Sequence, residues 1–525
     1  MPVQSTPGVD FLQLVPPITP TGGLTNWLAR AVRSAIADGR LPPSSVLPPS
    51  RVLAADLGVS RGVVVQAYQR LADEGLIDTR QGSGTRVLAA GDPSAGGRRP
   101  VAGALSSAPL PLRTTGGRPA TPTQPHTPTE PSTPTRPPTP TRPPTPSRPT
   151  LPLPGRHRWS GIEIDLSPGV PDLSAFPRAA WLRAEREGLA AADAADLGYG
   201  DPVGHPALRR ELAGWLTRTR GLRAGADDIV IVAGVAQSLA LLAQVLRSRG
   251  MTAIGVEDPG SRGARDQLGN WGLRPVPVPV DDDGLRVDEL ARTELTAAVL
   301  TPAHQFPTGV VLAPQRRRAV LQWASERGGL LIEDDYDAEY RYDRAPVAAL
   351  QASGSDRVAY TGSISKTLAP GMRLGWLVAP ARLREQLVAA KHANDLGCPV
   401  LPQLALARLL ATGGYDRHIR LVRTRQRKRR DALVASVREY LPGVRIQGIA
   451  AGLHLVLTLP ELDDDVDDVE LAHRISTAGV LVHPLSWHRH RSGPPGLVIG
   501  YAAHPADRLR EAARRMGQTL AAAPR

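Results

Sequence analysis

The chain has 525 residues, which is too long for one compact core and predicts about two or three folded units joined by linkers. Hydrophobic residues make up 41% and charged residues 22%, as in a globular protein, whereas 52 prolines and only 4% aromatics indicate a part that does not pack. The formal net charge of +13 favours a polyanionic partner, although a basic surface also serves solubility alone. The single cysteine, Cys398, excludes an intramolecular disulfide and a thiolate metal cluster, and we expect no metal site.

The first residues show no basic start followed by a continuous apolar run, which a signal peptide would have. No stretch reaches the roughly twenty apolar residues that span a bilayer. We therefore expect the protein in the cytoplasm, whose reducing conditions suit a lone cysteine.

Helix signals are dense from residue 24 onwards. Residues 24–38 predict a first helix, because apolar side chains recur there at helical spacing. After a proline-rich turn, Ser50 is predicted to cap a second helix, which Gly58 ends.

A third helix is predicted over residues 61–75, with Ser60 as its cap. One face, with Val64, Tyr68 and Leu71, is expected to be buried, and the other, with Arg61, Gln66 and Arg70, to point outward. The second and third helices, joined by Leu-Gly-Val-Ser, form a helix-turn-helix whose last helix would enter the major groove of DNA.

A glycine-rich hairpin over residues 76–87 predicts a wing, in which Arg80 and Arg86 can meet phosphates. The sequence of residues 47–87 resembles the GntR-family winged helix, since second helix, turn, recognition helix and Gly-Ser-Gly-Thr wing occur in order. The resemblance places the following residues at DNA: Arg51, Ser60, Arg61, Gln66, Arg80, Gly82, Ser83 and Gly84. The alternative is that the arginines are ordinary surface charges. Gly62 stands where relatives often have a polar side chain, so only its backbone can contact DNA.

Composition divides the chain into a DNA-binding domain, residues 1–90, a Pro/Thr/Arg-rich flexible linker, residues 91–160, and a large domain, residues 161–525. The near-repeat at residues 133–150 favours extended polyproline II and cannot bury a core, which predicts disorder. The linker is either a solvated spacer or, through its repeated arginines, a second contact to DNA phosphates. Its length predicts tolerance of variable half-site spacing, which base-pair insertions between half-sites would test.

After residue 162, apolar strand-like runs alternate with amphipathic helical stretches. The runs at 227–234, 296–303 and 328–336 predict strands, and residues 319–328 predict a helix. This alternation predicts an α/β fold with a mostly parallel central sheet, followed by a smaller C-terminal subdomain. The basic run at 415–434 is either a solvated helix face or a second DNA surface.

Residues 360–380 place Lys366 after a small polar run, with Arg373 seven residues later. This arrangement suits pyridoxal 5′-phosphate (PLP): Lys366 would form the Schiff base, while Ser363 and Arg373 hold the phosphate. A lysine in a polar loop is otherwise simply exposed. At the end of an apolar strand upstream, Asp334 would face the pyridine nitrogen and Tyr336 would hydrogen-bond the ring oxygen.

This combination resembles fold-type I aminotransferases of class I/II, and its fusion to a winged helix-turn-helix resembles the MocR subfamily of GntR regulators. The resemblance covers nearly the whole chain outside the linker. It implies a PLP cofactor and a homodimer, head to tail. Carried over by position, the backbone N–H groups of Gly234, Val235 and Ala236 would bind the phosphate, and Tyr199 would lie near the site, reaching towards the partner subunit.

Two positions depart from the aminotransferase pattern. Phe306 precedes Pro-Thr-Gly where aminotransferases generally carry asparagine, and His304 or Gln305 either substitutes for it or packs the loop. Val498 stands where an arginine would grip the substrate carboxylate, which disfavours ordinary transamination. The effector is therefore an amine without that carboxylate, a differently held amino acid, or PLP itself.

The resemblance implies a PLP-dependent transcription regulator of amine, amino-acid or vitamin B6 metabolism, nucleoid-associated when bound to double-stranded operator DNA. It would sense its effector through aldimine chemistry at Lys366. One alternative is a working aminotransferase with an attached DNA-binding domain, and another is a DNA-binding protein with an empty aminotransferase relic. Sustained keto-acid production from an amino donor would establish the enzyme.

Overall fold

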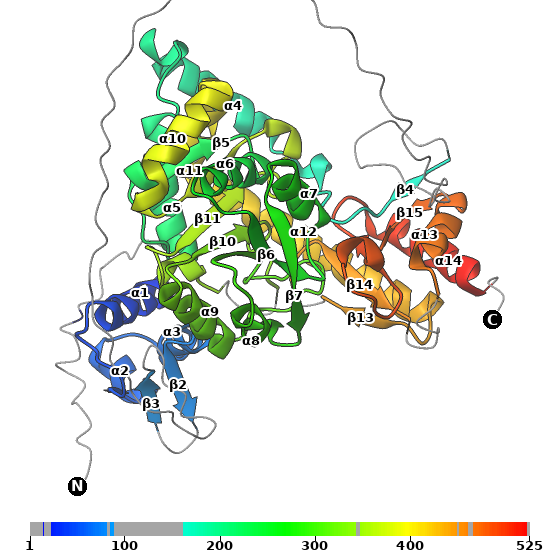
Figure 1. The fold of residues 1–525 in the computed structure, drawn as a ribbon, viewed down its shortest axis with the longest axis horizontal. Coiled ribbons are helices and arrows are strands. Elements are labelled where there is room, and N and C mark those ends of the chain that lie inside the picture. The colour runs from blue at the N-terminus through cyan, green and yellow to red at the C-terminus, as the bar shows by residue number, and fades with distance from the viewer. Residues whose placement is uncertain are drawn as a thin grey trace, which may run out of the picture. The chain divides into compact units, whose positions relative to one another are not determined.

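The computed structural model describes residues 14, 23–80, 84–88, 161–342, 347–448, 451–459 and 466–521 (Figure 1). The linker predicted at residues 91–160 lies outside the described residues. In the part of the chain that the structure describes, no helix combines the length and the apolar character that a membrane crossing requires.

Residues 24–87 form the three helices and the hairpin that the sequence predicts, and a further short strand, Val46–Leu47, extends the hairpin to a small antiparallel sheet. The helices are α1 (Leu24–Ala37), α2 (Ser50–Asp56) and α3 (Arg61–Asp73). The sheet has the strand order β1-β3-β2 and consists of β1 (Val46–Leu47), β2 (Ile77–Arg80) and β3 (Gly84–Val87). The predicted buried face of α3, with Val64, Tyr68 and Leu71, is confirmed, since it joins Leu28 and Val32 of α1 in one core.

Two details of this domain differ from the prediction. Pro49, in an extended conformation, precedes α2 as its N-cap, and Ser50 is already the first helical residue, so Ser50 is not the cap. Gly58 follows the helix with φ +62°, a left-handed conformation that favours glycine, and it ends α2 as predicted. Ser60 does occupy the N-cap position of α3, but its side chain makes no capping hydrogen bond.

The prediction that Arg70 points outward is wrong. Its side chain is buried, donates a hydrogen bond to Asn26 and lies 3.5 Å from a carboxylate oxygen of Glu74. Glu74 also forms a bidentate ion pair with Arg33 of α1, with distances of 2.9 and 2.7 Å. Arg70 therefore ties α3 to α1 and is not part of the exposed face of the helix.

The large domain is built on an eight-stranded sheet in the order β5-β12-β11-β10-β9-β6-β7-β8. Its strands are β5 (Ile229–Val232), β6 (Ala253–Asp258), β7 (Arg274–Asp281), β8 (Gly284–Leu285), β9 (Ala297–Leu300), β10 (Leu330–Asp335), β11 (Val358–Ser363) and β12 (Gly375–Val378). The neighbours β7, β6, β9, β10 and β11 run parallel, whereas β12 is antiparallel to both β11 and β5. The predicted mostly parallel α/β sheet is confirmed.

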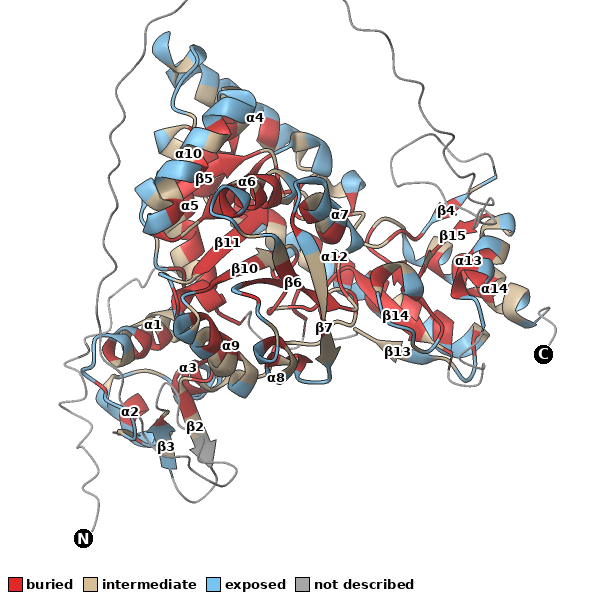
Figure 2. Cartoon of the chain, in the orientation of Figure 1, coloured by how far each residue is buried: buried red, intermediate tan, exposed pale blue. Residues whose placement is uncertain are grey.

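Helices cover both faces of this sheet, which therefore forms the buried centre of the domain (Figure 2). They are α4 (Arg178–Ala191), α5 (Pro206–Arg220), α6 (Val235–Ser248), α7 (Arg262–Asn270), α8 (Val287–Ala291), α9 (Pro314–Glu326), α10 (Ala381–Asp395), α11 (Val400–Ala411) and α12 (Gly414–Tyr440). Strand β5 shows the two faces: Ile229 and Ile231 pack with α4, α5 and α11, whereas Val230 and Val232 pack with α6, α7 and α10. A strand buried on both faces reads as an unbroken apolar run, which is why it was recognisable in the sequence.

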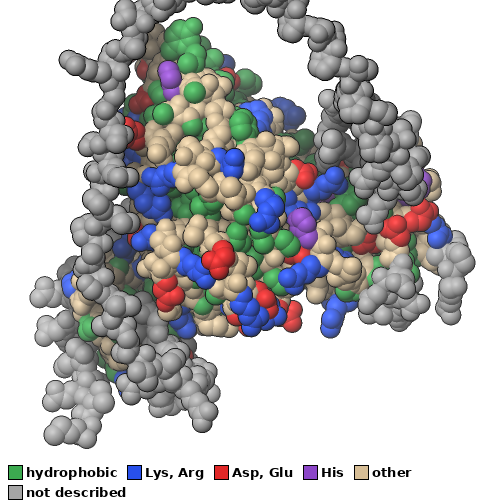
Figure 3. All heavy atoms as spheres, viewed as in Figure 1, with side chains coloured by type: hydrophobic (Ala, Val, Ile, Leu, Met, Phe, Trp, Pro, Cys, Tyr) green, Lys and Arg blue, Asp and Glu red, His purple; other side chains and the backbone are tan. Residues whose placement is uncertain are grey.

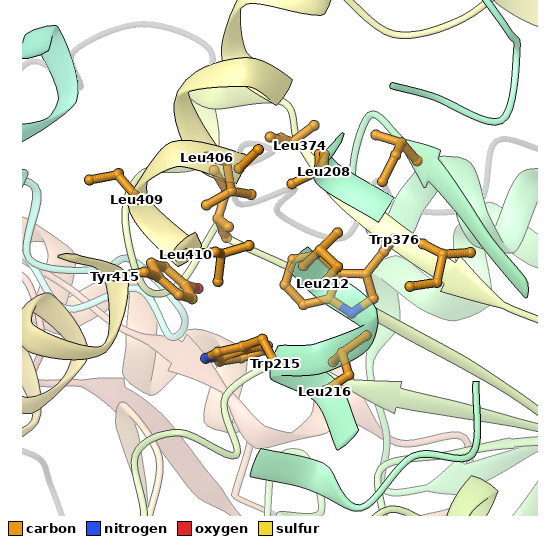
Figure 4. Close-up of a cluster of buried hydrophobic side chains, with 14 of the residues drawn as sticks. Leu208, Leu212, Trp215, Leu216, Leu374, Trp376, Leu406, Leu409, Leu410 and Tyr415 are labelled. Carbon is orange, nitrogen blue, oxygen red and sulfur yellow. The ribbon is translucent and has the colours of Figure 1, made fainter. Parts of the chain in front are cut away.

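Leucine and aromatic side chains fill the core on the first of these faces (Figure 4). The ring of Trp215 on α5 lies 6.0 Å from that of Trp376 on β12 and 5.4 Å from that of Tyr415 on α12, in edge-on arrangements. The indole N–H of Trp215 donates to Asp416 at 2.9 Å. These contacts fasten α5 and α12 to the sheet beside the strands that carry the candidate site.

The C-terminal part forms the smaller subdomain that the sequence predicts. Its four-stranded antiparallel sheet has the order β13-β14-β17-β16, and β15 pairs in parallel with β4. These elements are β4 (Ile164–Asp165), β13 (Arg445–Gln447), β14 (His454–Thr458), β15 (Val480–Leu481), β16 (His483–Pro484), β17 (Gly496–Gly500), α13 (Asp468–Thr477) and α14 (Ala506–Ala521). Short 3₁₀ turns complete the chain at Leu173–Ala175, Ala195–Leu197, Ala226–Asp228, Leu350–Ala352, Pro370–Met372 and Leu485–His488.

The basic run at 415–434 lies within α12 and is a solvated helix face only in part. Arg429 and Arg430 are buried. Arg425 and Arg429 each lie 3.1 Å from Asp172, and the guanidinium of Arg430 lies 4.9 Å from the ring centroid of Tyr342. On the face shown in Figure 3, basic side chains are spread among acidic and uncharged groups and form no continuous patch.

Candidate functional site

The exposed side of the helix-turn-helix carries most of the residues predicted to contact DNA. Arg51, Ser60, Arg61 and Gln66 are exposed, and Arg61 donates a long hydrogen bond of 3.5 Å to Ser50. The exposed stripe of α3 also includes Val65, which is 45% exposed and which the sequence reasoning did not single out. An exposed valine on a recognition helix suits contact with a thymine methyl group.

The wing is described only at its strands. Arg80 pairs with Gly84 at the end of the β2–β3 ladder, and Gly84 has φ +79°. Gly82, Ser83 and the side chain of Arg80 lie outside the described residues, so their predicted contacts with DNA stay predictions.

Lys366 follows β11 in a short turn and lies at the edge of the sheet where the parallel strands end. Its Nζ donates a hydrogen bond of 2.6 Å to the carbonyl of Gly169. Burial lowers the pKa of the Lys366 amine, and the charges of Asp337 and Asp334 oppose that shift in part. A lowered pKa favours the neutral amine, which is the form that attacks a carbonyl carbon.

Asp334 lies on the neighbouring strand β10 and is paired with Thr361 of β11. Its Oδ1 atom is buried and has no hydrogen-bond partner among the described residues. Burial, followed by the charge of Asp335, raises the pKa of the Asp334 carboxyl to about 7. An orphaned buried carboxylate oxygen fits a protonated ring nitrogen as its partner, which is the role that the sequence predicts for this residue.

A cradle for a phosphate lies where β11, β12 and the start of α6 approach one another. Gly234, with φ +105°, precedes α6, so the N–H groups of Val235 and Ala236 begin the helix without acceptors inside it. A Cβ atom on Gly234 would lie 3.4 Å from both terminal nitrogens of Arg373. A helix N-terminus beside a guanidinium is suited to binding a phosphate.

Close contact between strands builds this cradle. Ser363 is paired with Gly375, and its Oγ accepts a hydrogen bond of 3.3 Å from the N–H of Ser365. A Cβ on Gly375 would lie 2.7 Å from the carbonyl oxygen of Gly362 and 3.0 Å from the Cα of Gly234, so a side chain at this position would push the backbone segments of the cradle apart.

Tyr336, which directly follows β10, and His304 lie within hydrogen-bond distance of each other. The Tyr336 hydroxyl lies 2.9 Å from Nδ1 of His304, which also lies 3.1 Å from both carboxylate oxygens of Asp337. The Nε2 atom of His304 is buried without a partner among the described residues. His304 is therefore available as a polar neighbour of a bound ring, while Asp337 fixes the orientation of its imidazole.

Gln305 behaves differently from its neighbour. Its amide donates to the carbonyls of Pro259 and Phe306 at 2.8 and 2.6 Å, and its oxygen accepts from both the N–H and the hydroxyl of Thr308. These bonds occupy the side chain within the loop. Of the two alternatives that the sequence left open, Gln305 packs the loop.

Phe306 and Val498, the two departures from the aminotransferase pattern, lie together in one small apolar cluster with Val456 and Leu485. Val498 is fully buried in β17. A valine in this setting offers no hydrogen bond to a carboxylate, as the sequence indicates.

Tyr199 does not join this group of side chains within one chain. It is 87% exposed and lines an open pocket with Leu396, Gly397 and Gln403. Its predicted place beside the cofactor of a partner subunit stays a prediction.

Two family models match the chain: aminotransferase class I and II over residues 162–516, and bacterial regulatory proteins, gntR family, over residues 24–87. The probable rhizopine catabolism regulatory protein MocR of Rhizobium meliloti is 30% identical over 488 residues, which are 92% of this chain and 91% of that protein. The pyridoxine biosynthesis transcriptional regulator PdxR of Corynebacterium glutamicum is 33% identical over 94% of this chain and 95% of its own. The chain belongs to the MocR subfamily of GntR-type regulators.

The large domain of this MocR-type chain also resembles solved enzymes. A kynurenine aminotransferase of Pyrococcus horikoshii, solved with pyridoxamine phosphate (PMP) and its substrate, superposes with a TM-score of 0.63 at 28% identity and covers 69% of this chain and 91% of its own. The aminotransferase class I and II domain indicates PLP as the cofactor. The unpartnered Asp334 oxygen, the Lys366 amine and the cradle at Gly234 fit that molecule.

Some residues of the site of this MocR-type regulator escaped the sequence reasoning. Gly169, which accepts the hydrogen bond from Lys366, carries no local signal. Asp337 follows Tyr336 directly, and its acidic side chain was a visible candidate as the partner of a nearby histidine.

Proposed function

We propose that this regulator binds operator DNA through its winged helix and responds to a primary amine, an amino acid or PLP itself at the Lys366 site. The observation that carries the proposal is the unpartnered buried Oδ1 of Asp334 beside Lys366, in a chain that also holds an exposed recognition helix. The names of the two regulators, for rhizopine catabolism and pyridoxine biosynthesis, support target genes of amine, amino-acid or vitamin B6 metabolism.

When bound, the cofactor supplies an aldehyde that condenses reversibly with primary amines. Lys366 would hold that aldehyde, Asp334 would hold the proton on the ring nitrogen, and Tyr336 with His304 would face the ring oxygen. Ser363, Arg373 and the N–H groups of Gly234, Val235 and Ala236 would bind the phosphate. An effector amine competes with the Lys366 amine, which would then be free to donate to Gly169, as it does in the structure.

Regulation requires that the effector bind one state of the protein better than another, because a ligand that binds both states equally does not change their populations. The regulator would act in the cytoplasm as a head-to-tail homodimer, in which Tyr199 of each subunit reaches the site of the other. Its 87% exposure in a single chain supports that arrangement.

The decisive experiment joins both halves of the proposal. Binding sites are selected from random duplex DNA with the full-length protein, and the affinity for the selected duplex is measured with PLP, with and without a panel of amines and amino acids. We expect at least one amine to change the affinity of the wild type and none to change that of Lys366→Ala. The proposal is contradicted if an amine still changes the DNA affinity of Lys366→Ala. It is also contradicted if neither the panel nor excess PLP changes the DNA affinity of the wild type.

Arg61→Ala tests the DNA-binding face. If Arg61 reads a base edge, its loss is expected to weaken binding of the selected duplex by about 1–3 kcal/mol, which is about a 5-fold to 150-fold change. Arg292→Ala, which removes a 68% exposed side chain from the large domain, is the matched control and should leave the affinity unchanged. Equal effects of the two substitutions would show that Arg61 is an ordinary surface charge.

The second candidate function is transamination, which the completeness of the cofactor site favours and the burial of Val498 opposes. Steady keto-acid formation from an amino donor, absent in Lys366→Ala, would establish it.

A further inference from the structure

Polar side chains outside the cofactor site lie buried without partners on the far side of Phe306. Nitrogen atoms of His454, His483, His488 and Arg265 are buried and have no hydrogen-bond partner among the described residues; in His488 this holds for both ring nitrogens. Folded proteins pair roughly nine-tenths or more of such groups. Unpartnered buried atoms also occur elsewhere in the described residues, such as Arg317 and Trp323, and this group stands out because it adjoins the cofactor site.

This cluster is continuous with the cofactor site. The ring of Phe306 lies 5.0 Å from that of His488, 4.9 Å from that of His454 and 6.0 Å from that of Tyr336. Arg265, on α7, lines the same small pocket as Asp334. Arg265 and His488 therefore lie beside the residues that would hold the cofactor.

Arg265 determines the chemistry of this second site. Its Nη2 donates a hydrogen bond of 2.6 Å to the carbonyl of Trp487, whereas Nη1 is buried without an acceptor. Asp258 and Asp266 raise the pKa of Arg265, but neither lies within ion-pair distance of it. Asp266 instead pairs with Arg262 at 3.5 Å. A guanidinium has donors only, so the missing partner of Nη1 is an acceptor, and a buried cation gains most from an anion.

His488 complements this cation. Burial, with the nearby His483 and Arg265, lowers the pKa of His488 well below its ordinary value, so the ring is neutral and one nitrogen carries a proton to donate. Trp487, whose carbonyl holds Arg265, is the residue before His488 in the chain. The two donors therefore lie where α7 meets the turn Leu485–His488.

We propose that Arg265 and His488 form a seat for the acidic group of the effector, which is thus a small amine bearing a carboxylate or a comparable acid. This inference rests on the proposed function, because it needs the effector amine at Lys366. Arg265, on α7, would thus bind the acidic group that an arginine at the position of Val498, on β17, would otherwise bind. His454, beside Phe306, and His483, stacked on His488, each add one unpartnered ring nitrogen.

The test uses full-length protein loaded with PLP and matched pairs of probes that differ only in the acid: L-alanine against ethylamine, and 4-aminobutyrate against propylamine. The readout is the displacement of the Lys366-dependent visible absorption band, which reports binding and needs no turnover. In the wild type we expect the acid of at least one pair to act at a concentration at least about tenfold lower than its matched amine. Arg265→Met is expected to abolish that difference by weakening the acid alone.

Two further variants make the result specific. Arg262→Met removes a half-exposed arginine from the same helix and should keep the preference for the acid. His488→Phe keeps the ring contacts and should reduce the preference in part. Because Arg265→Met removes an unpaired buried charge, its effector-free midpoint of thermal unfolding is expected at or above that of the wild type, which also shows that the variant is folded.

The outcomes separate the two proposals. If the absorption band forms but acid and amine act alike in the wild type, or if Arg265→Met keeps the difference, the seat is wrong and the cofactor site stands. If wild type forms no Lys366-dependent band, the proposed function itself fails.

Discussion

Asp335→Ala is expected to destabilise the large domain by about 3–5 kcal/mol, because it leaves a buried guanidinium without its partner. The Nε atom of Arg220 lies 2.6 Å from Asp335, and the two side chains are only 2% and 3% exposed. Asp335 also accepts a hydrogen bond of 2.5 Å from the hydroxyl of Tyr360. The loss should appear as a lower midpoint in thermal and urea denaturation.

An exposed ion pair of the same length gives the control. Arg286 and Asp288 also approach to 2.6 Å, but their side chains are 38% and 47% exposed, so Asp288→Ala is expected to leave the midpoint unchanged. Asp335→Asn, which keeps an acceptor for Tyr360, should fall between the wild type and Asp335→Ala. If Asp288→Ala and Asp335→Ala cost the same, burial does not decide the strength of these pairs.

Asp334→Asn is expected to weaken PLP binding by about 2–5 kcal/mol, at least about 30-fold in affinity, because a neutral amide cannot hold the proton on the ring nitrogen. The raised pKa of Asp334, about 7, adds a pH dependence. One pH unit below that value the carboxyl is mostly protonated, and one unit above it is mostly ionised. Wild-type affinity for PLP should therefore rise over this window, and Asp334→Asn should lose the part of the rise that Asp334 contributes.

Spectroscopic titration with PLP at several pH values measures this effect. Glu333→Gln is the matched control: Glu333 is the preceding residue of β10, burial raises its pKa to about 7 as well, and it faces the other side of the sheet, where it accepts from the N–H groups of Leu350 and Gln351. It should leave PLP affinity and its pH dependence unchanged.

In the cofactor-free protein, the effect of Asp334 on the stability of the fold has the opposite dependence on pH. A carboxyl whose pKa is raised by folding stabilises the fold at low pH, and this contribution is lost as the pH rises through about 7. Asp334→Asn is therefore expected to raise the midpoint of unfolding of the cofactor-free protein above that pH. A lower midpoint in the variant would contradict the unpartnered state of Asp334.

Local patterns predicted the elements of this fold well, because apolar periodicity is a property of neighbouring residues. The helix expected at residues 24–38 is α1, and the runs containing Ile229, Ala297 and Leu330 are strands of the sheet. Arg70 was misplaced because its partner Asn26 lies on another helix, and no local pattern reports such a contact. Ser50 was misplaced by one residue because Pro49 already provides the extended position before the helix.

The candidate site was predictable where strand order decides it. Asp334 lies near the end of β10 and Lys366 follows β11, its parallel neighbour, so their proximity followed from the fold class. The approach of Gly169 to Lys366 and of Arg265 to Trp487 joins segments about 200 residues apart, without a motif. His454 and His488 were visible as residues, but only the structure brings them to Phe306.

The phosphate end of this site and the end beyond Phe306 differ in how many substitutions they can accept. The phosphate end depends on Gly234, Gly362 and Gly375, where an added methyl group would meet the Arg373 guanidinium, the Trp376 indole and backbone atoms, respectively. The far end is formed by side chains, such as those of Phe306 and Arg265, which can be replaced without a glycine-dependent backbone contact being lost. If the proposed function holds, single substitutions at the far end would change which ligand this protein prefers, while the phosphate end and Lys366 stay the same.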